Sequence, residues 1–599
     1  MRHAHVQYTH HAFLVAWGAF AMYLKLPERL QQVPLHQKRY QYAPHTKVLE
    51  FLVAILAGLP HLQDISCAAH PLQRDQAVAE AWGQPGWAHY TGVSRTLSAL
   101  TLEEVEALIQ VLEEISQPFI EQECQLIQGQ GKRVCLDGDL TGLPVSNGSR
   151  TYPGARYGHM KGDIRLGYQA ALVSLVSPTY GRLWLSVAHH AGDTVSCTQA
   201  EAMVLAAEQR LGMRPRRRTE LLQTRIQQVQ EAMEATQRRY QAQQRLLQEA
   251  ECRLQEAQET YEMRVREYEH LAERYRVEGR PETPYSALAK ARTRMHGAQK
   301  RLTRRRQDVA QAQKRKEKTQ GVLVAQQNTL HQLQTRLARF EQDNATNPEP
   351  RAMEFRLDAG FGTYENVALL IEMGYEVYIK PYSHRVTAYL RKQVDGPASW
   401  TRVGANAEMV SWADYALPGC PYPLDVGLLR YHTGKTIRHS ALLHFGDDPV
   451  TQDLPHWFHH YNGRQTIEAG IKEAKHVFHL HRIKVRSEPA IILQEYLVTF
   501  AANFIRWAMH WFSTLPQDES QALDVQSLGM KRQVQVGTHV SAQVISGSEG
   551  RLLKFSQTSV FAGKVLRLPA TKSRATRPPV FALLKALFMK WHLIAQPLR

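Results

Sequence analysis

Residues 461–475 have the sequence YNGRQTIEAGIKEAK, and the rest of the chain is organised around this stretch. Tyr461, Arg464, Glu468 and Lys475 follow one another at intervals of three, four and seven residues. At 3.6 residues per turn, all four lie within an arc of about 60° on one helix face. The carboxylate on this face is suited to a metal ion, and its hydroxyl and cationic neighbours are suited to phosphates. The same spacing also fits a solvated face with an Arg464–Glu468 pair.

Two strand-like segments carry further acids for such a site. Residues 133–144, RVCLDGDLTGLP, are β-like and place Asp137 and Asp139 on one face, because residues two apart in a strand point the same way. Residues 353–357 form a second expected strand, which ends on Asp358. Hard divalent cations such as Mg²⁺ or Mn²⁺ prefer carboxylate oxygens. We therefore expect Asp139, Asp358 and Glu468 to converge on two cations, with Asp137 as a second candidate for the first acid.

The order of the expected elements predicts an α/β fold around a mixed sheet. The segments are strands at 133–144, 168–176 and 182–188, a helix at 198–211, a strand at 353–357, a helix at 364–373, a strand at 375–380 and helices at 456–475 and 490–511. Three strands, a helix, an acid-bearing strand, a helix and a strand, followed by a glutamate-bearing helix, are the topology of an RNase H-like core flanked by helices. Two large insertions interrupt this core.

With these motifs in this order, the chain resembles the bacterial insertion-sequence transposases of the DDE class that carry the Y-R-E-K signature. Residues 461–475 match the spacing of that signature without a gap. The first Asp of the family stands in a D-x-T context, which residues 139–141 match, and the second stands in an R-x-D-x-G-F context, which residues 356–361 match. The resemblance covers residues 131–212, 350–395 and 455–510.

The resemblance implies a DNA transposase that cleaves transposon ends and joins them to target DNA by two-metal-ion phosphoryl transfer. Asp139, Asp358 and Glu468 would hold Mg²⁺. The residues implied or predicted to contact DNA are Tyr461, Arg464, Lys475, Lys161, Lys472, Trp400 and Trp412, the two tryptophans as candidates to stabilise a flipped base or simply to pack in a core. Two other functions stay open: a nuclease of the same fold that only hydrolyses DNA, and a non-catalytic DNA-binding or architectural protein.

Composition points to a polyanionic partner. The chain has 599 residues, 43% of them hydrophobic, and a formal net charge of +17. Such an excess favours nucleic acid, and the resemblance implies double-stranded DNA with terminal inverted repeats, target DNA and a homodimer in the DNA complex. Six scattered cysteines without a C-x-x-C pair fit a reducing cytosol, and the resemblance implies the cytoplasm of a bacterium, with action at the nucleoid. The apolar run 12–24 is too short to span a bilayer, so we expect no membrane role.

Residues 215–341 predict a long antiparallel coiled-coil hairpin. Apolar residues recur at alternating spacings of four and three, and the pattern breaks only at 279–284, GRPETP. Each arm would extend roughly 80–90 Å at 1.5 Å per residue. The second arm is rich in lysine and arginine between residues 290 and 318. This basic stretch is either an arm that contacts DNA or a solvated face that glutamates of the first arm partly neutralise.

These patterns divide the chain into seven expected segments. They are a helical N-terminal DNA-binding or assembly domain (1–130), three parts of the catalytic core (131–212, 350–384 and 455–511, the last with the glutamate helix), the coiled-coil insertion (213–349), a β-rich insertion (385–454) and a C-terminal region (512–599). Short strands are expected at 386–390 in the β-rich insertion and at 533–544 and 551–568 in the C-terminal region.

Overall fold

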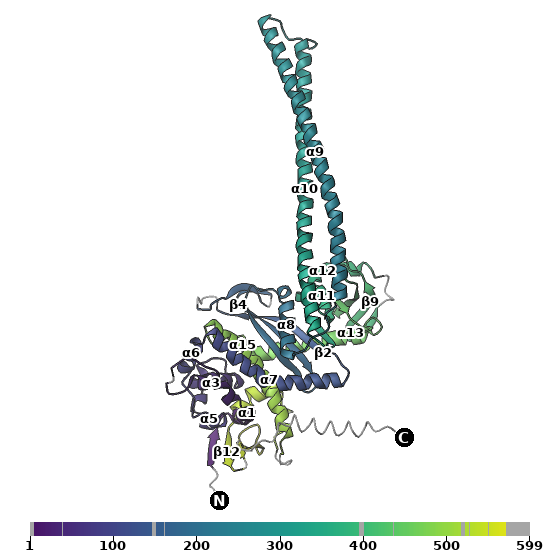
Figure 1. Ribbon diagram of the computed structural model, residues 1–599. Helices are drawn as coiled ribbons and strands as arrows, with labels where there is room; N and C mark the ends of the chain where they lie inside the picture. The colour runs from purple at the N-terminus through teal and green to yellow at the C-terminus, as the bar shows by residue number, and fades with distance from the viewer. Residues whose placement is uncertain are drawn as a thin grey trace, which may run out of the picture. The chain divides into compact units, whose positions relative to one another are not determined.

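Ten strands form one mixed sheet within residues 5–38, 40–146, 151–160, 162–394, 400–434, 436–516, 522–525, 527–548 and 550–570, which the computed structural model describes (Figure 1). The strands are β2 (Val134–Pro144), β3 (Arg156–Met160), β4 (Asp163–Ser177), β5 (Gly181–Ala191), β6 (Met353–Leu357), β7 (Glu376–Ile379), β8 (Thr401–Gly404), β9 (Ala407–Tyr415), β10 (Leu424–Thr433) and β11 (Thr436–Phe445). Their order is β3-β4-β2-β6-β7-β11-β10-β9-β8, and β5 pairs with β4. The predicted mixed α/β fold is confirmed in this respect.

The centre of the sheet is parallel. Strand β2 pairs in parallel with β6, and β6 pairs in parallel with β7. All residues of β6 and β7 are buried, as parallel strands require when helices cover both faces of a sheet. The connections include helices α8 (Ala200–Leu211) and α11 (Tyr364–Glu372). On the other side of β2, strand β4 runs antiparallel to both β2 and β5.

The predicted β-rich insertion extends the same sheet. Strand β11 pairs antiparallel with β7, and β10, β9 and β8 follow it outward. The strand expected at residues 386–390 is wrong, because these residues lie in helix α12 (His384–Arg391). The Ser383 side chain caps this helix, and Val386 and Leu390, four residues apart, share its buried face.

A strand at residues 5–9 pairs with strands between residues 542 and 569 in a four-stranded sheet. Its order is β1 (His5–Thr9), β12 (Ala542–Gly547), β13 (Gly550–Phe555) and β14 (Val565–Pro569). The N-terminal helices are α1 (Ala12–Tyr23), α2 (Leu26–Leu30), α3 (Pro44–Leu56), α4 (Asp64–Cys67), α5 (Gln76–Ala81), α6 (Tyr90–Ser98) and α7 (Leu102–Gly129). The strand expected from residue 533 begins later, because helix α16 (Met530–Gln535) buries Gln533, whose amide donates a 2.6 Å hydrogen bond to the Leu528 carbonyl.

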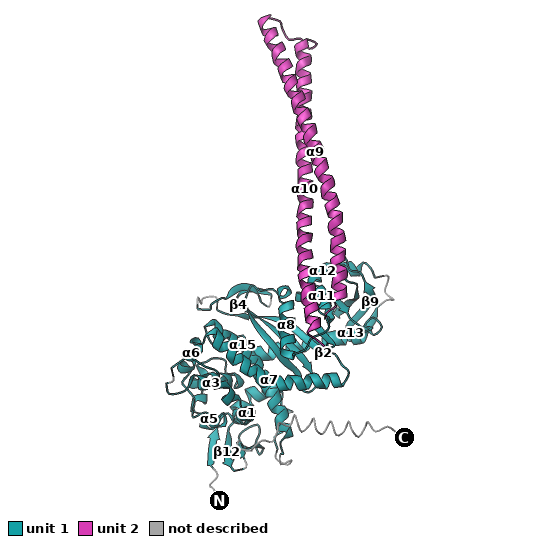
Figure 2. Ribbon diagram, viewed as in Figure 1, with its two compact units in different colours: residues 1–216, 349–599 teal, residues 217–348 magenta. Residues whose placement is uncertain are grey.

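The chain divides into two compact units, residues 1–216 with 349–599 and residues 217–348 (Figure 2). The second unit consists of two long helices, α9 (Thr219–Val277) and α10 (Ala287–Ala345), which lie side by side. An ion pair of 2.8 Å joins Arg217 to Asp343 at one end, and one of 3.2 Å joins Arg294 to Glu267 toward the other. The helices are therefore antiparallel. In the described part of the chain, no helix is both long and apolar enough to cross a membrane.

Candidate active site

Three carboxylates lie where the parallel strands end and a helix crosses them. Asp139 is in β2, Asp358 directly follows β6, and Glu468 is in helix α14 (Gln465–His476). Asp139 accepts a 2.8 Å hydrogen bond from the Leu140 amide, and Asp358 accepts one of the same length from the Gly360 amide. Because β2 and β6 run in parallel, both aspartates stand toward the same edge of the sheet.

The three acids interact electrostatically. Burial, together with the neighbouring charges of Asp358 and Glu468, raises the pKa of Asp139 to about 7, against the opposing effects of Arg464 and of the Leu140 amide. A carboxyl group with this pKa is near the midpoint of its titration at neutral pH. Such a shift, caused by burial and like charges, is typical of functional sites.

Arg464 lies between the carboxylates. Its Nη2 atom donates a 3.0 Å hydrogen bond to Glu468 Oε1, and its Nη1 atom is 4.0 Å from Asp139 Oδ2. The Nη1 atom is buried and has no hydrogen-bond partner among the described residues. The guanidinium therefore partly neutralises the acids and keeps one donor unused.

A close packing contact seats helix α14 on the sheet. Ile467, Gly470 and Ile471 are on its buried face. A Cβ atom at Gly470 would lie 1.9 Å from the Arg182 guanidinium of β5, so glycine allows the helix to come this close. Glu468 on this helix comes close enough to act electrostatically on Asp139 in the middle of β2.

The described residues contain no preassembled group of three or more His, Cys, Asp and Glu side chains at metal-binding distances. The available donors nevertheless suit a hard divalent cation, since three carboxylates supply oxygen ligands and Arg464 places positive charge among them. The fit is therefore one of chemistry, and a bound cation would compete with the guanidinium for the same oxygens.

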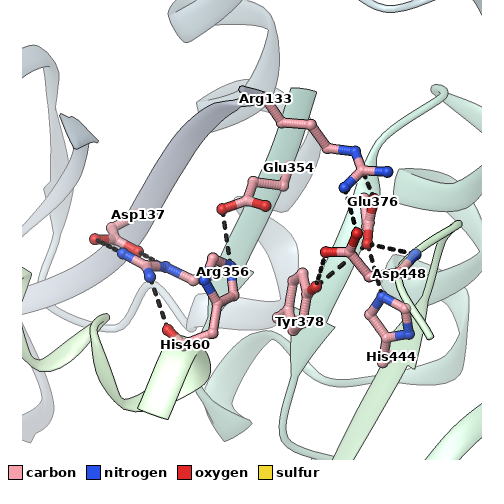
Figure 3. Close-up of polar contacts among 9 residues, drawn as sticks. All are labelled: Arg133, Asp137, Glu354, Arg356, Glu376, Tyr378, His444, Asp448 and His460. Atoms are coloured by element: carbon pink, nitrogen blue, oxygen red, sulfur yellow. Dashed lines mark hydrogen bonds and ion pairs between the residues drawn. The ribbon is translucent and has the colours of Figure 1, made fainter. Parts of the chain in front are cut away.

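Asp137 is fully buried, and its side chain faces Arg356 (Figure 3). Its two oxygens accept hydrogen bonds of 2.7 and 2.9 Å from Nε and Nη2 of Arg356, which lies opposite it on β6. Both carboxylate oxygens are thus occupied by a bidentate pair. This arrangement favours Asp139 over Asp137 as the first acid of the site.

Arg356 also holds the chain segment that carries the signature residues. Its Nη1 atom donates a 2.7 Å hydrogen bond to the carbonyl of His460 in helix α13 (Leu454–Asn462) (Figure 3). A Cβ atom at Gly463 would lie 2.8 Å from the same Nη1 atom. The His460 ring is in turn 2.9 Å from Glu354 on β6. These contacts therefore fix the junction of α13 and α14 to strand β6, and through the Asp137–Arg356 pair to β2.

A second group of polar residues continues this buried network toward β11. Arg133 pairs with Glu376 and Asp448 at 2.7 Å each, and the Tyr378 hydroxyl donates a 2.8 Å hydrogen bond to Asp448 (Figure 3). The His444 ring lies 2.9 Å from Glu376. These contacts attach β11 and the loop after it to β7, so the outer strands and the central sheet are held together by charge as well as by backbone pairing.

Two signature side chains are bonded inside the protein. Tyr461 is 3% exposed, and its hydroxyl donates to the Leu357 carbonyl at 3.2 Å. Lys475 is 5% exposed, and its ammonium donates to Thr141 Oγ1 at 2.5 Å and to the Gly142 carbonyl at 2.8 Å. Both therefore tie the helices to the strand ends, and their contact with phosphates stays a prediction.

The remaining predicted DNA contacts lie in different settings. Lys472 is exposed on α14, and Lys161 lies outside the described residues. Trp400 and Trp412 are half-buried; the Arg430 guanidinium stacks over the Trp400 ring at 4.2 Å, and Trp412 lies beside Tyr415. Neither tryptophan belongs to the buried core of the outer strands around Met409 and Trp457.

Sequence reasoning missed Lys380, which directly follows β7. Its ammonium lies 5.3 Å from the centre of the Tyr461 ring, and burial and the Arg464 charge lower its pKa while Glu468 and Asp358 oppose this effect. Its position after a predicted strand, like that of Asp358, was the available signal.

In sequence, the chain matches no known family model and no curated protein.

Proposed function

We propose that this chain is a DNA transposase of the DDE class with the Y-R-E-K signature, acting in the bacterial cytoplasm on double-stranded DNA with terminal inverted repeats and on target DNA. The observation that carries the proposal is the grouping of Asp139 in β2, Asp358 after β6 and Glu468 in α14 around Arg464. The strand order β5-β4-β2-β6-β7 supports an RNase H-like core, and the two antiparallel helices support a coiled-coil hairpin inserted into it.

In this proposal the three carboxylates bind the metal ions, and the basic side chains of Arg464 and Lys380 bind the DNA. Asp139, Asp358 and Glu468 would hold Mg²⁺ or Mn²⁺, which would supply the charge stabilisation that an in-line phosphoryl displacement needs. Arg464 orients Glu468 and offers its unused Nη1 donor to a phosphate oxygen. Lys380 supplies a second positive charge beside the same acids.

The test compares purified full-length protein with its Glu468→Gln variant on DNA that carries the repeats flanking the gene, with and without Mg²⁺. The variant is expected to bind DNA normally but to cleave at least about 10³-fold more slowly, because loss of an ion ligand removes several kcal/mol of transition-state stabilisation. Glu473→Gln is the matched control, since Glu473 lies on the same helix but pairs with Arg506 at 2.7 Å.

The products separate the competing functions. End cleavage followed by strand joining supports a transposase, whereas cleavage without joining supports a nuclease of the same fold. Metal-independent binding without any cleavage, unchanged by Glu468→Gln, would contradict both enzymatic functions. The homodimer is checked on the same complexes by measuring their mass.

A further inference from the structure

The second arm of the helix pair carries a dense basic segment, residues 300–318 of α10. Its cationic residues are Lys300, Arg301, Arg304, Arg305, Arg306, Lys314, Arg315, Lys316 and Lys318, against which the segment has only two acids, Asp308 and Glu317. All of the cationic side chains are exposed except Arg305 and Lys316, which are half-buried. The segment is about 27 Å long at 1.5 Å per residue.

The glutamates of the first arm leave this segment largely without partners. Arg305 pairs with Asp308 at 3.1 Å, but none of the other eight cations has an ion-pair partner among the described residues. The acids of α9 are bonded largely within their own helix, as in the pairs Glu249–Arg253 and Glu273–Arg276. The alternative was a solvated face that glutamates of the first arm partly neutralise. The ion pair between the two helices that joins Arg294 to Glu267 lies outside residues 300–318, so it does not neutralise this segment.

The segment also lacks the features of a helix that lies on a membrane. Leu302 is buried and Val309 is half-buried, and the segment exposes no bulky apolar side chain. Binding of an amphipathic helix to a bilayer needs such side chains on the exposed face. A helix segment with about one cation every two residues and no exposed apolar side chains is suited to bind a rigid polyanion instead. Double-stranded DNA is such a polyanion, because it carries one negative charge per roughly 1.7 Å of helix axis.

We propose that residues 300–318 of α10 form a second DNA-binding surface, which contacts the phosphate backbone of double-stranded DNA without reading its sequence. The choice of DNA as the polyanion rests on the proposed function, whereas the charge pattern is observed in the sequence and the structure independently of that function. The surface lies wholly within the second unit, so it shares no residue with the site formed by Asp139, Asp358 and Glu468.

The experiment measures binding of the full-length protein to duplex DNA of random sequence, without divalent ions, across a range of salt concentrations. A variant with Lys300, Arg301, Arg304 and Arg306 all changed to Gln is compared with wild type. Each phosphate contact contributes about 0.9 to the slope of log affinity against log salt. The slope is therefore expected to fall by up to roughly 3.6.

The matched control changes Arg238, Arg239, Arg245 and Arg266 of α9 to Gln, which removes the same charge from exposed positions on the first arm. Its slope should fall by less than about 1. Equal slopes for wild type and the α10 variant, or equal losses in both variants, would overturn the proposal. Circular dichroism of each variant establishes that the helices remain formed.

Two further binding measurements identify the polyanion. Duplex RNA bound more tightly than DNA through the same residues would overturn the assignment to DNA, and so would residue-dependent binding to phosphatidylserine vesicles without DNA binding. The readout is independent of the proposed chemistry. Loss of cleavage in Glu468→Gln together with the reduced salt slope of the α10 variant supports both proposals, and a chain that never cleaves DNA but shows the α10-dependent slope retains this one alone.

Discussion

Acidic side chains occupy two contrasting regions of the same sheet. In the interior network, Asp137 is paired with Arg356, and Glu376 is paired with Arg133 and lies beside His444 (Figure 3). At the strand ends, Asp358 accepts a hydrogen bond only from a backbone amide among the described residues, and Asp139 is 4.0 Å from its nearest cation. Residue type is the same in both regions, so the partner decides whether an acid supports the fold or remains available for chemistry.

The difference has an energetic consequence. A buried acid with a bidentate partner holds the fold together, because removing one member leaves the other charged and buried. A buried acid beside other acids works against folding in its ionised form. The strand ends are therefore maintained at a cost in stability, which is the pattern expected where function rather than packing determines the residue.

Breaking the interior network should have the largest effect on stability. Asp137→Asn leaves the Arg356 guanidinium, which is 4% exposed, without its charged partner, and we expect a loss of about 3–5 kcal/mol in the free energy of unfolding. Urea unfolding followed by tryptophan fluorescence measures it. Every tryptophan of the chain lies outside residues 217–348, so the signal reports on the larger unit alone.

The control for this comparison is an exposed acid. Glu349 is 78% exposed and pairs with Arg351 at 2.8 Å, so Glu349→Gln should change the free energy of unfolding by less than about 1 kcal/mol. If Asp137→Asn costs no more than Glu349→Gln, the network does not have the supporting role assigned to it.

Neutralising an acid at the strand ends should have the opposite sign and depend on pH. The pKa of Asp139 rises from 3.8 in the unfolded chain to about 7 in the folded one, so the folded state holds its proton more tightly. Wild-type stability from this group is complete below about pH 4 and is lost as the pH rises through 7. The Asp139→Asn side chain cannot ionise, so the variant does not lose this stability and should be more stable than wild type at pH 8.

The measurement is urea unfolding at pH 5 and pH 8 in EDTA, which keeps divalent ions away from the acids. At about 1.4 kcal/mol per pKa unit, the gain at pH 8 is expected to reach a few kcal/mol and to shrink at pH 5. A gain of equal size at both pH values would show that Asp139 does not titrate as assigned.

Local patterns determined how much was predictable from the sequence. Asp139 and Asp358 were found because each stands in or directly after a short strand-like run, and Glu468 because of its helical spacing. The pairing of Asp137 with Arg356 depends on the register of β2 against β6, which joins residues 219 positions apart and leaves no local signal. The pairing of β11 with β7 is equally non-local.

The signature residues show the same limit. The single helix expected at residues 456–475 is two helices, with Tyr461 in α13 and with Glu468 and Lys475 in α14. The spacing of the signature placed Tyr461, Arg464, Glu468 and Lys475 on one face, but it did not say what that face meets. In the folded chain Arg464 and Glu468 meet the acids, whereas Tyr461 and Lys475 meet backbone carbonyls at the ends of β6 and β2. Periodicity therefore predicts which residues share a face, and the packing of the sheet decides their partners.

The smallest effect, and the one that separates a supporting role from a DNA contact most directly, is expected at the two lysines of α14. Lys475→Met removes the ammonium that bonds Thr141 and Gly142, and should lower the free energy of unfolding by about 1–3 kcal/mol. Lys472→Met changes an exposed residue of the same helix and should leave it within about 0.5 kcal/mol of wild type. Urea unfolding and DNA affinity are measured on both variants. Weaker DNA binding by Lys475→Met at unchanged stability would place Lys475 among the phosphate contacts instead. If Lys475 bonded only inside the protein, its replacement could weaken DNA binding only by destabilising the fold.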